Sequence, residues 1–160
     1  MNRSFLSGQW QSNYHALSIQ FNENVWRLIE DGFDNEERCL FGLFSENDGA
    51  SFSLDLTLKD PALHYDTDFA EAEFFARMFN MDNHCQRLGT INLLIDDVPF
   101  IADRYQFMNS KYGNQMVTRA MHIDTTFVIA IGMAWPLDMH LEERFPIKFN
   151  HLIASIQLPK

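Results

Sequence analysis

Apolar and polar residues alternate over much of the chain, and one uncharged stretch interrupts this pattern. Residues 126–135 read TFVIAIGMAW, with large apolar side chains at every second position and mostly small ones between them. In an extended segment successive side chains point to opposite faces, so one face here is large and the other small. The pattern predicts the central strand of an antiparallel sheet, with a helix packed closely on the small face.

The remaining alternating or apolar runs predict flanking strands. The cleanest is residues 51–59, where Phe52, Leu54 and Leu56 alternate with polar residues. The last four predicted strands follow one another as a meander, whereas residues 1–12 are polar and are predicted to be irregular. Strands are predicted at residues 14–21, 25–29, 39–44, 51–59, 86–95, 100–108, 116–123 and 126–135.

Two segments have helical spacing instead. Residues 68–81 carry a phenylalanine-rich stripe, and residues 146–157 repeat apolar side chains after Pro146, which suits the first turn of a helix. The predicted fold class is therefore α+β: a twisted antiparallel sheet of six to eight strands flanked by two main helices, as an α/β/α sandwich. No linker or repeat divides the chain, so residues 1–160 are predicted to form a single domain.

Composition and charge restrict the partners. The 160 residues include 15 Phe and 8 Met, which either fill the core or line an adaptable apolar groove for a partner. The net charge of −10 repels phosphate backbones, so no nucleic-acid partner is expected. The same charge suits a basic protein partner, or serves solubility alone.

Sequence motifs for chemistry are missing. Cys39 and Cys85 lie far apart, no two histidines have the spacing of a helical zinc motif, and no nucleophile elbow or glycine-rich phosphate loop occurs. We therefore expect no catalytic residues, no metal and no cofactor. The N-terminal residues contain no signal-like apolar run, and no stretch is apolar over a membrane-spanning length, so the protein is expected to be cytoplasmic and not membrane-embedded.

Mixed polar faces on three strands predict a partner-binding surface on the less covered face of the sheet. Short polar groups and methionines there could seat an apolar helix, although an ordinary solvated sheet face explains the same pattern. The predicted partner-binding residues are Ser51, Ser53, Asp55, Thr57, Arg104, Gln106, Met108, Met116, Thr118 and His122.

The order of these elements, with a helix between the first strands and the meander and another at the end, resembles the PsbP/DcrB-like superfamily. The sequence departs from that superfamily at Asn24-Val25-Trp26, where members often have a Pro-Gly-Trp turn, and it lacks the signal sequence of secreted members. The segments that carry the resemblance are residues 50–57, 68–75, 95–102 and 149–158.

Members of that superfamily are mostly non-catalytic binding modules. They include photosystem accessory subunits, small-GTPase binders and the Eag-type chaperones, which hold apolar segments of type VI secretion effectors. The resemblance implies that this chain binds another protein, as a chaperone for an apolar helical segment of a secreted effector. Two alternatives stay open: an immunity protein that meets a basic toxin surface, and a small enzyme of unknown type. The chain could also form a homodimer.

Overall fold

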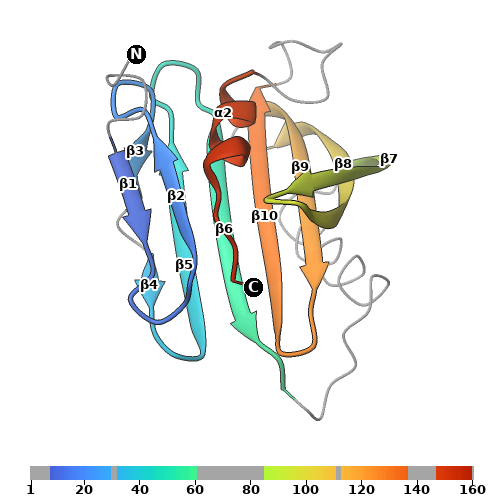
Figure 1. Cartoon of the computed structure of the whole chain (residues 1–160). Helices are drawn as coiled ribbons and strands as arrows, with labels where there is room; N and C mark the ends of the chain where they lie inside the picture. The colour runs from blue at the N-terminus through green and yellow to red at the C-terminus, as the bar shows by residue number, and fades with distance from the viewer. Residues whose placement is uncertain (1–7, 30–31, 61–84, 111–112, 137–146, 160) are drawn as a thin grey trace.

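The computed structural model describes residues 8–29, 32–60, 85–110, 113–136 and 147–159 (Figure 1). Ten strands and one helix lie within these ranges. The strands are β1 (Gly8–Gln11), β2 (Ser18–Phe21), β3 (Arg27–Leu28), β4 (Phe33–Asp34), β5 (Arg38–Phe44), β6 (Ser51–Leu58), β7 (Cys85–Ile95), β8 (Val98–Ser110), β9 (Gly113–Ile123) and β10 (Phe127–Pro136). The helix is α2 (Ile147–Ser155). This helix is too short to cross a membrane, and the described part contains no other.

The main sheet is antiparallel and has β10 in its middle. Its strand order is β3-β5-β6-β10-β9-β8-β7, and β4 pairs with β5 beside β3. The predicted antiparallel sheet, its central strand and the meander formed by the last four strands are therefore confirmed. The turn between β7 and β8 has Asp96 and Asp97 at φ of 51° and 62°, values that a tight hairpin requires and that Asp tolerates.

The core lies on the large apolar face of β10. Ile131 pairs with Leu54 of β6 and Met133 pairs with Phe52, and all four side chains are buried. α2 packs on this same face, where the Phe149 ring lies 5.5 Å from the Trp135 ring. α2 is therefore not the helix predicted on the small face, and that prediction is untested because the other predicted helix, at residues 68–81, lies outside the described residues. Packing on the large face removes more apolar surface from water.

A two-stranded sheet covers the part of the core over β5, as Figure 1 shows. Gly8–Gln11 had been expected to be irregular but forms β1, because the Trp10 ring packs 4.9 Å from that of Phe41 and pairing with β2 satisfies its backbone. β2 is shorter than predicted. The Ser12 hydroxyl accepts hydrogen bonds from the backbone N–H groups of Tyr14 and His15, and this turns the chain before the strand begins.

The predicted fold class, an α+β sandwich with two main helices, is wrong. The described part is mostly β, with an eight-stranded sheet, a two-stranded sheet and one short helix. The helix predicted at residues 146–157 corresponds to α2, whereas the one predicted at residues 68–81 lies outside the described residues. Strand pairing also continues beyond the predicted strand ends, as where Ser110 pairs with Gly113, because ladder hydrogen bonds need no apolar side chain.

Candidate functional site

The ten predicted partner-binding residues do not lie on one face of the sheet. Ser53 of β6 pairs with Gly132 and shares its face, which points away from α2. Thr118 of β9 pairs with Met133 and therefore lies on the covered face. Sequence polarity could not separate the two sets, because β8 and β9 turn polar residues toward the covered face. Ser51, Ser53, Asp55 and Thr57 form the first set, and Arg104, Gln106, Met116, Thr118 and His122 the second.

Met108 belongs to β8, but its side chain lies outside the described part. Within the first set, the Asp55 side chain is held in place by its neighbours. Its two carboxylate oxygens accept hydrogen bonds from Nε and Nη2 of Arg38 at 3.0 and 2.6 Å, and Thr57 donates a further one at 3.2 Å. This half-buried network orders the polar face of β6. Whether it contacts a partner stays a prediction.

The second set faces the covered side of the sheet, and two of its five members are buried. Met116 and Thr118 are buried, and Met116 belongs to the main apolar cluster. His122 is held in place by neighbours: its Nδ1 lies 3.0 Å from the carbonyl oxygen of Pro99, and its ring lies 5.5 Å from that of Phe100. These positions stabilise the sheet, and a contact with a partner there remains a prediction.

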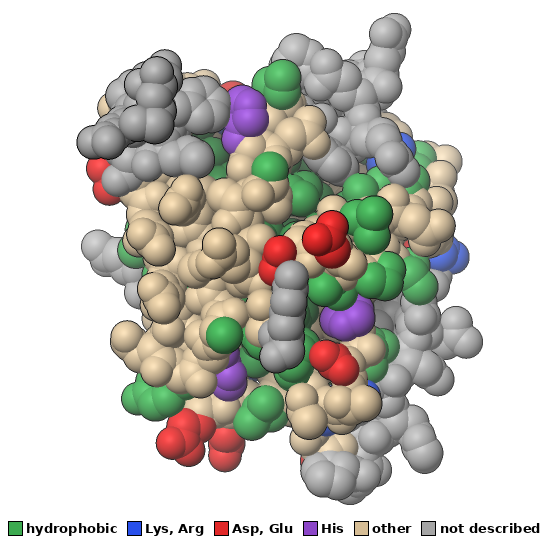
Figure 2. All heavy atoms as spheres, viewed as in Figure 1, with side chains coloured by type: hydrophobic (Ala, Val, Ile, Leu, Met, Phe, Trp, Pro, Cys, Tyr) green, Lys and Arg blue, Asp and Glu red, His purple; other side chains and the backbone are tan. Residues whose placement is uncertain are grey.

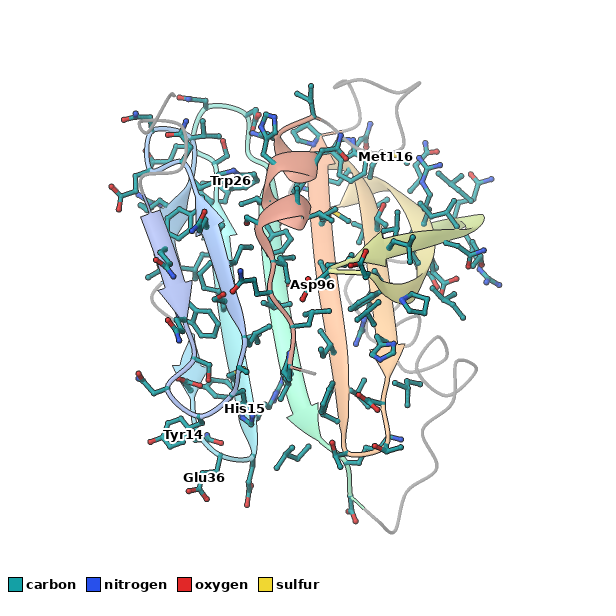
Figure 3. The ribbon with its side chains drawn as sticks, viewed as in Figure 1. Tyr14, His15, Trp26, Glu36, Asp96 and Met116 are labelled. Carbon is teal, nitrogen blue, oxygen red and sulfur yellow. The ribbon has the colours of Figure 1, made fainter. Side chains whose placement is uncertain are left out.

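A hollow of about 210 Å³ lies between α2 and the turn that joins β2 to β3; we call it the Trp26 hollow. The turn is tight because the carbonyl of Asn22 accepts hydrogen bonds from the N–H groups of Val25 and Trp26. Figure 3 shows Trp26 beside α2 and Met116 on the other side of this helix. The lining residues are Phe21, Asn22, Val25, Trp26, Ile147, Lys148, His151 and Leu152.

A larger hollow of about 520 Å³ adjoins the first, and we call it the β3 hollow. The two share Phe21, Val25 and Trp26, so they form neighbouring parts of one surface. Its remaining lining is mostly polar, and an ion pair joins Arg27 to Glu46 across it. The residues that it adds are Gln9, Glu23, Asn24, Arg27, Leu28, Phe44, Glu46 and Asn47.

Lys148 fixes the wall of the Trp26 hollow. Its ammonium group hydrogen-bonds to Ser45 and Asp48 and lies 5.0 Å from the centre of the Trp26 ring. Burial is the largest influence on the pKa of Asp48 and raises it. The hydrogen bonds from Lys148, the Ala50 N–H and Ser45, together with the Lys148 charge, outweigh burial and hold that pKa below 3.8. The ion pair therefore ties the start of α2 to the β5–β6 turn.

The described groups offer recognition surfaces more than reactive ones. Burial raises the pKa of the Cys39 thiol to about 11, so it stays protonated and unreactive at neutral pH. Within the described ranges, His, Cys, Asp and Glu side chains form no group of three that could hold a metal ion. The two hollows instead present apolar surface edged by amide and charged groups.

Sequence reasoning did not find either hollow. The pattern predicts strands at residues 14–21 and 25–29, but α2 is about 120 positions further along the chain. The long-range packing of Trp26 on Phe149, with ring centres 5.5 Å apart, and on the Lys148 ammonium group brings these segments together. No protein-family model matches the sequence, and no curated protein matches it either.

Proposed function

We propose that this chain is a non-catalytic binding module for another polypeptide, and that an apolar side chain of the partner enters the Trp26 hollow. The observation that carries the proposal is an apolar hollow with a fixed wall, bordered by a larger polar one. Protein interfaces have this anatomy, in which a buried apolar anchor is surrounded by a polar rim. The volume of about 210 Å³ falls below the roughly 300–1,000 Å³ of small-molecule sites, so the Trp26 hollow by itself suits one large side chain.

The charge of the chain supports a partner with basic residues near its apolar anchor. The net charge is −10, and acidic side chains are more prominent than basic ones on the face that carries α2 (Figure 2). Such a field speeds the encounter with a basic segment and disfavours acidic ones. The narrower role that we propose is a chaperone for an apolar segment of a secreted effector. The acidic charge equally supports an immunity protein that binds a basic toxin.

The test replaces one exposed apolar residue at the hollow and one elsewhere. Ile147 lines the Trp26 hollow and is 67% exposed, while Leu94 of β7 is 71% exposed on the other face of the sheet. Tagged wild type, Ile147→Glu and Leu94→Glu are purified from the native host, and bound polypeptides are quantified by mass spectrometry. We expect Ile147→Glu to lose roughly tenfold or more of one bound polypeptide, which Leu94→Glu retains.

Equal recovery with all three proteins would contradict the proposal. If a bound polypeptide is found, deletion of the gene for this chain distinguishes the chaperone role from the immunity-protein role. Loss of the bound polypeptide from the cell would show that it is a client that needs a chaperone. Sensitivity of the cell to that polypeptide, at unchanged abundance, would show that the chain is an immunity protein.

A further inference from the structure

Arg104 lies in a cross-strand row on the covered face of the sheet. Its neighbour on β7 is Gly89 and its neighbour on β9 is Thr118, and Thr118 in turn pairs with Met133 of β10. The next row along the strands joins Gln106, Met116 and Trp135. Residues in facing and diagonal positions of adjacent strands are within reach of long and aromatic side chains. Arg104, Thr118 and Trp135 are therefore grouped on one patch of the sheet.

Three buried atoms of this patch have no hydrogen-bond partner within the described structure: Nε of Arg104, Oγ1 of Thr118 and Nε1 of Trp135. Thr118 is 0% exposed and Trp135 is 1% exposed, so bulk water does not replace the missing partners. No ion pair to Arg104 occurs among the described residues either. Buried polar groups are nearly always paired, so three together indicate a partner that the described residues do not supply.

The hydrogen-bonding capacity and charge of these three groups indicate which chemical group can bind them. The guanidinium and indole N–H groups can only donate, and the guanidinium carries a positive charge. A water molecule would satisfy one or two of them but would then need acceptors for its own two protons. A carboxylate accepts several hydrogen bonds and neutralises one guanidinium. Beside Arg104 the sheet is open on the β7 side, because a Cβ at Gly89 would have no atom within 4 Å.

We propose that Arg104, Thr118 and Trp135 bind a carboxylate group inside the covered face of the sheet. The carboxylate accepts hydrogen bonds from Nε of Arg104, Oγ1 of Thr118 and Nε1 of Trp135, and it compensates the Arg104 charge. This site is separate from the Trp26 hollow and does not depend on the protein-binding role. Its ligand class is a small molecule or side chain that carries a carboxylate.

The test observes the donor N–H groups in ¹H–¹⁵N spectra of the full chain during titration with sodium acetate. A parallel titration with sodium chloride at equal ionic strength is the control. Acetate is expected to shift the Trp135 indole N–H and the Arg104 Nε–H together and saturably. The indole signals of Trp10 and Trp26 serve as internal controls and are expected to stay in place. Thr118→Val replaces the hydroxyl with a methyl group of similar size and is expected to weaken acetate binding roughly tenfold. Thr118→Ser keeps the hydroxyl and is expected to bind as the wild type does.

Arg104→Lys, which keeps the charge but loses Nε–H, is expected to weaken binding at least as much as Thr118→Val. Absence of a saturable shift, or shifts that chloride reproduces, would overturn the proposal and leave ordered water as the occupant. Unchanged binding in Thr118→Val would overturn it as well, even if Arg104→Lys fails to fold. Equal loss in Thr118→Val and Thr118→Ser would assign the effect to packing and would also contradict it.

Discussion

The ammonium group of Lys148 lies 5.0 Å from the centre of the Trp26 ring while it hydrogen-bonds to Asp48. One side chain of α2 therefore contacts both the β2–β3 turn and the β5–β6 turn. The side chains of Lys148 and Asp48 are 17% and 26% exposed, so the pair is partly shielded from water. Such shielding strengthens a charge-assisted hydrogen bond relative to a pair on the surface. We infer that Lys148 sets the position of α2 against the Trp26 hollow.

Lys148→Met is expected to lower the free energy of unfolding by about 1.5–3 kcal/mol, the usual contribution of a hydrogen bond to a charged group. The substitution keeps the length of the side chain but leaves Asp48 partly buried without its cation. Arg27→Met is the matched control, because Arg27 and Glu46 form an ion pair with side chains 67% and 63% exposed and worth at most about 1 kcal/mol. Urea denaturation of both variants measures the difference, and equal losses would refute the role of Lys148.

The same pair predicts a pH dependence. The pKa of Asp48 is held below its ordinary value in the folded protein, so the stability that the pair contributes is fully present at pH values above the ordinary, unfolded-state pKa. The contribution is lost as the pH falls through the lower folded-state pKa. Carboxyl ¹³C titration is expected to show the Asp48 pKa rising in Lys148→Met, because burial then acts with less opposition. An unchanged Asp48 pKa in the variant would show that the ion pair does not form in solution.

The close approach of β6 and β10 gives a prediction about packing. A Cβ added at Gly132 would lie 2.7 Å from Oγ of Ser53, which is too short for an undisturbed contact. Gly132→Ala is therefore expected to destabilise the protein by about 1 kcal/mol or more through overpacking. The double variant with Ser53→Ala removes the clashing oxygen and is expected to recover most of that loss. Strictly additive effects in the denaturation cycle would mean that these residues are not neighbours.

The C-terminal segment is predicted to depend on Asp96. The backbone N–H of Leu158 donates a hydrogen bond of 2.9 Å to Oδ2 of Asp96, at the tip of the β7–β8 hairpin (Figure 3). Asp96→Ala should remove the protection of the Leu158 amide against hydrogen exchange. Asp97→Ala is the matched control, since Asp97 has a similar positive φ of 62° and alanine at either position would strain the backbone to a similar extent. Comparable protection of Leu158 in both variants would disprove the link.

Local sequence pattern was enough to predict most of the main sheet. The uncharged run that ends at Trp135 alternates large and small side chains, as a buried strand does, and the alternation of residues 51–59 defined the buried face of β6. Strand order within the meander followed because consecutive antiparallel strands with short turns are neighbours in space. These features depend on short-range periodicity, which is visible in a single sequence.

Features set by distant contacts could not be predicted. β1 is stable because Trp10 packs on Phe41, about 30 positions away, while its own residues are mostly polar. Polarity placed Thr118 on an exposed face, whereas the pairing with Met133 puts it in the interior. The same limit explains the Trp26 hollow, since its two walls come from opposite ends of the chain.

Site-specific photo-crosslinking in the native host tests the central claim, that the Trp26 hollow receives an apolar side chain of another polypeptide. The photoreactive amino acid p-benzoylphenylalanine is placed at position 147, on the rim of the hollow, or at position 94 on the other face of the sheet. We predict that position 147 crosslinks one polypeptide within an apolar segment and that position 94 does not. No crosslink at position 147, or the same products from both positions, would contradict this account of the protein.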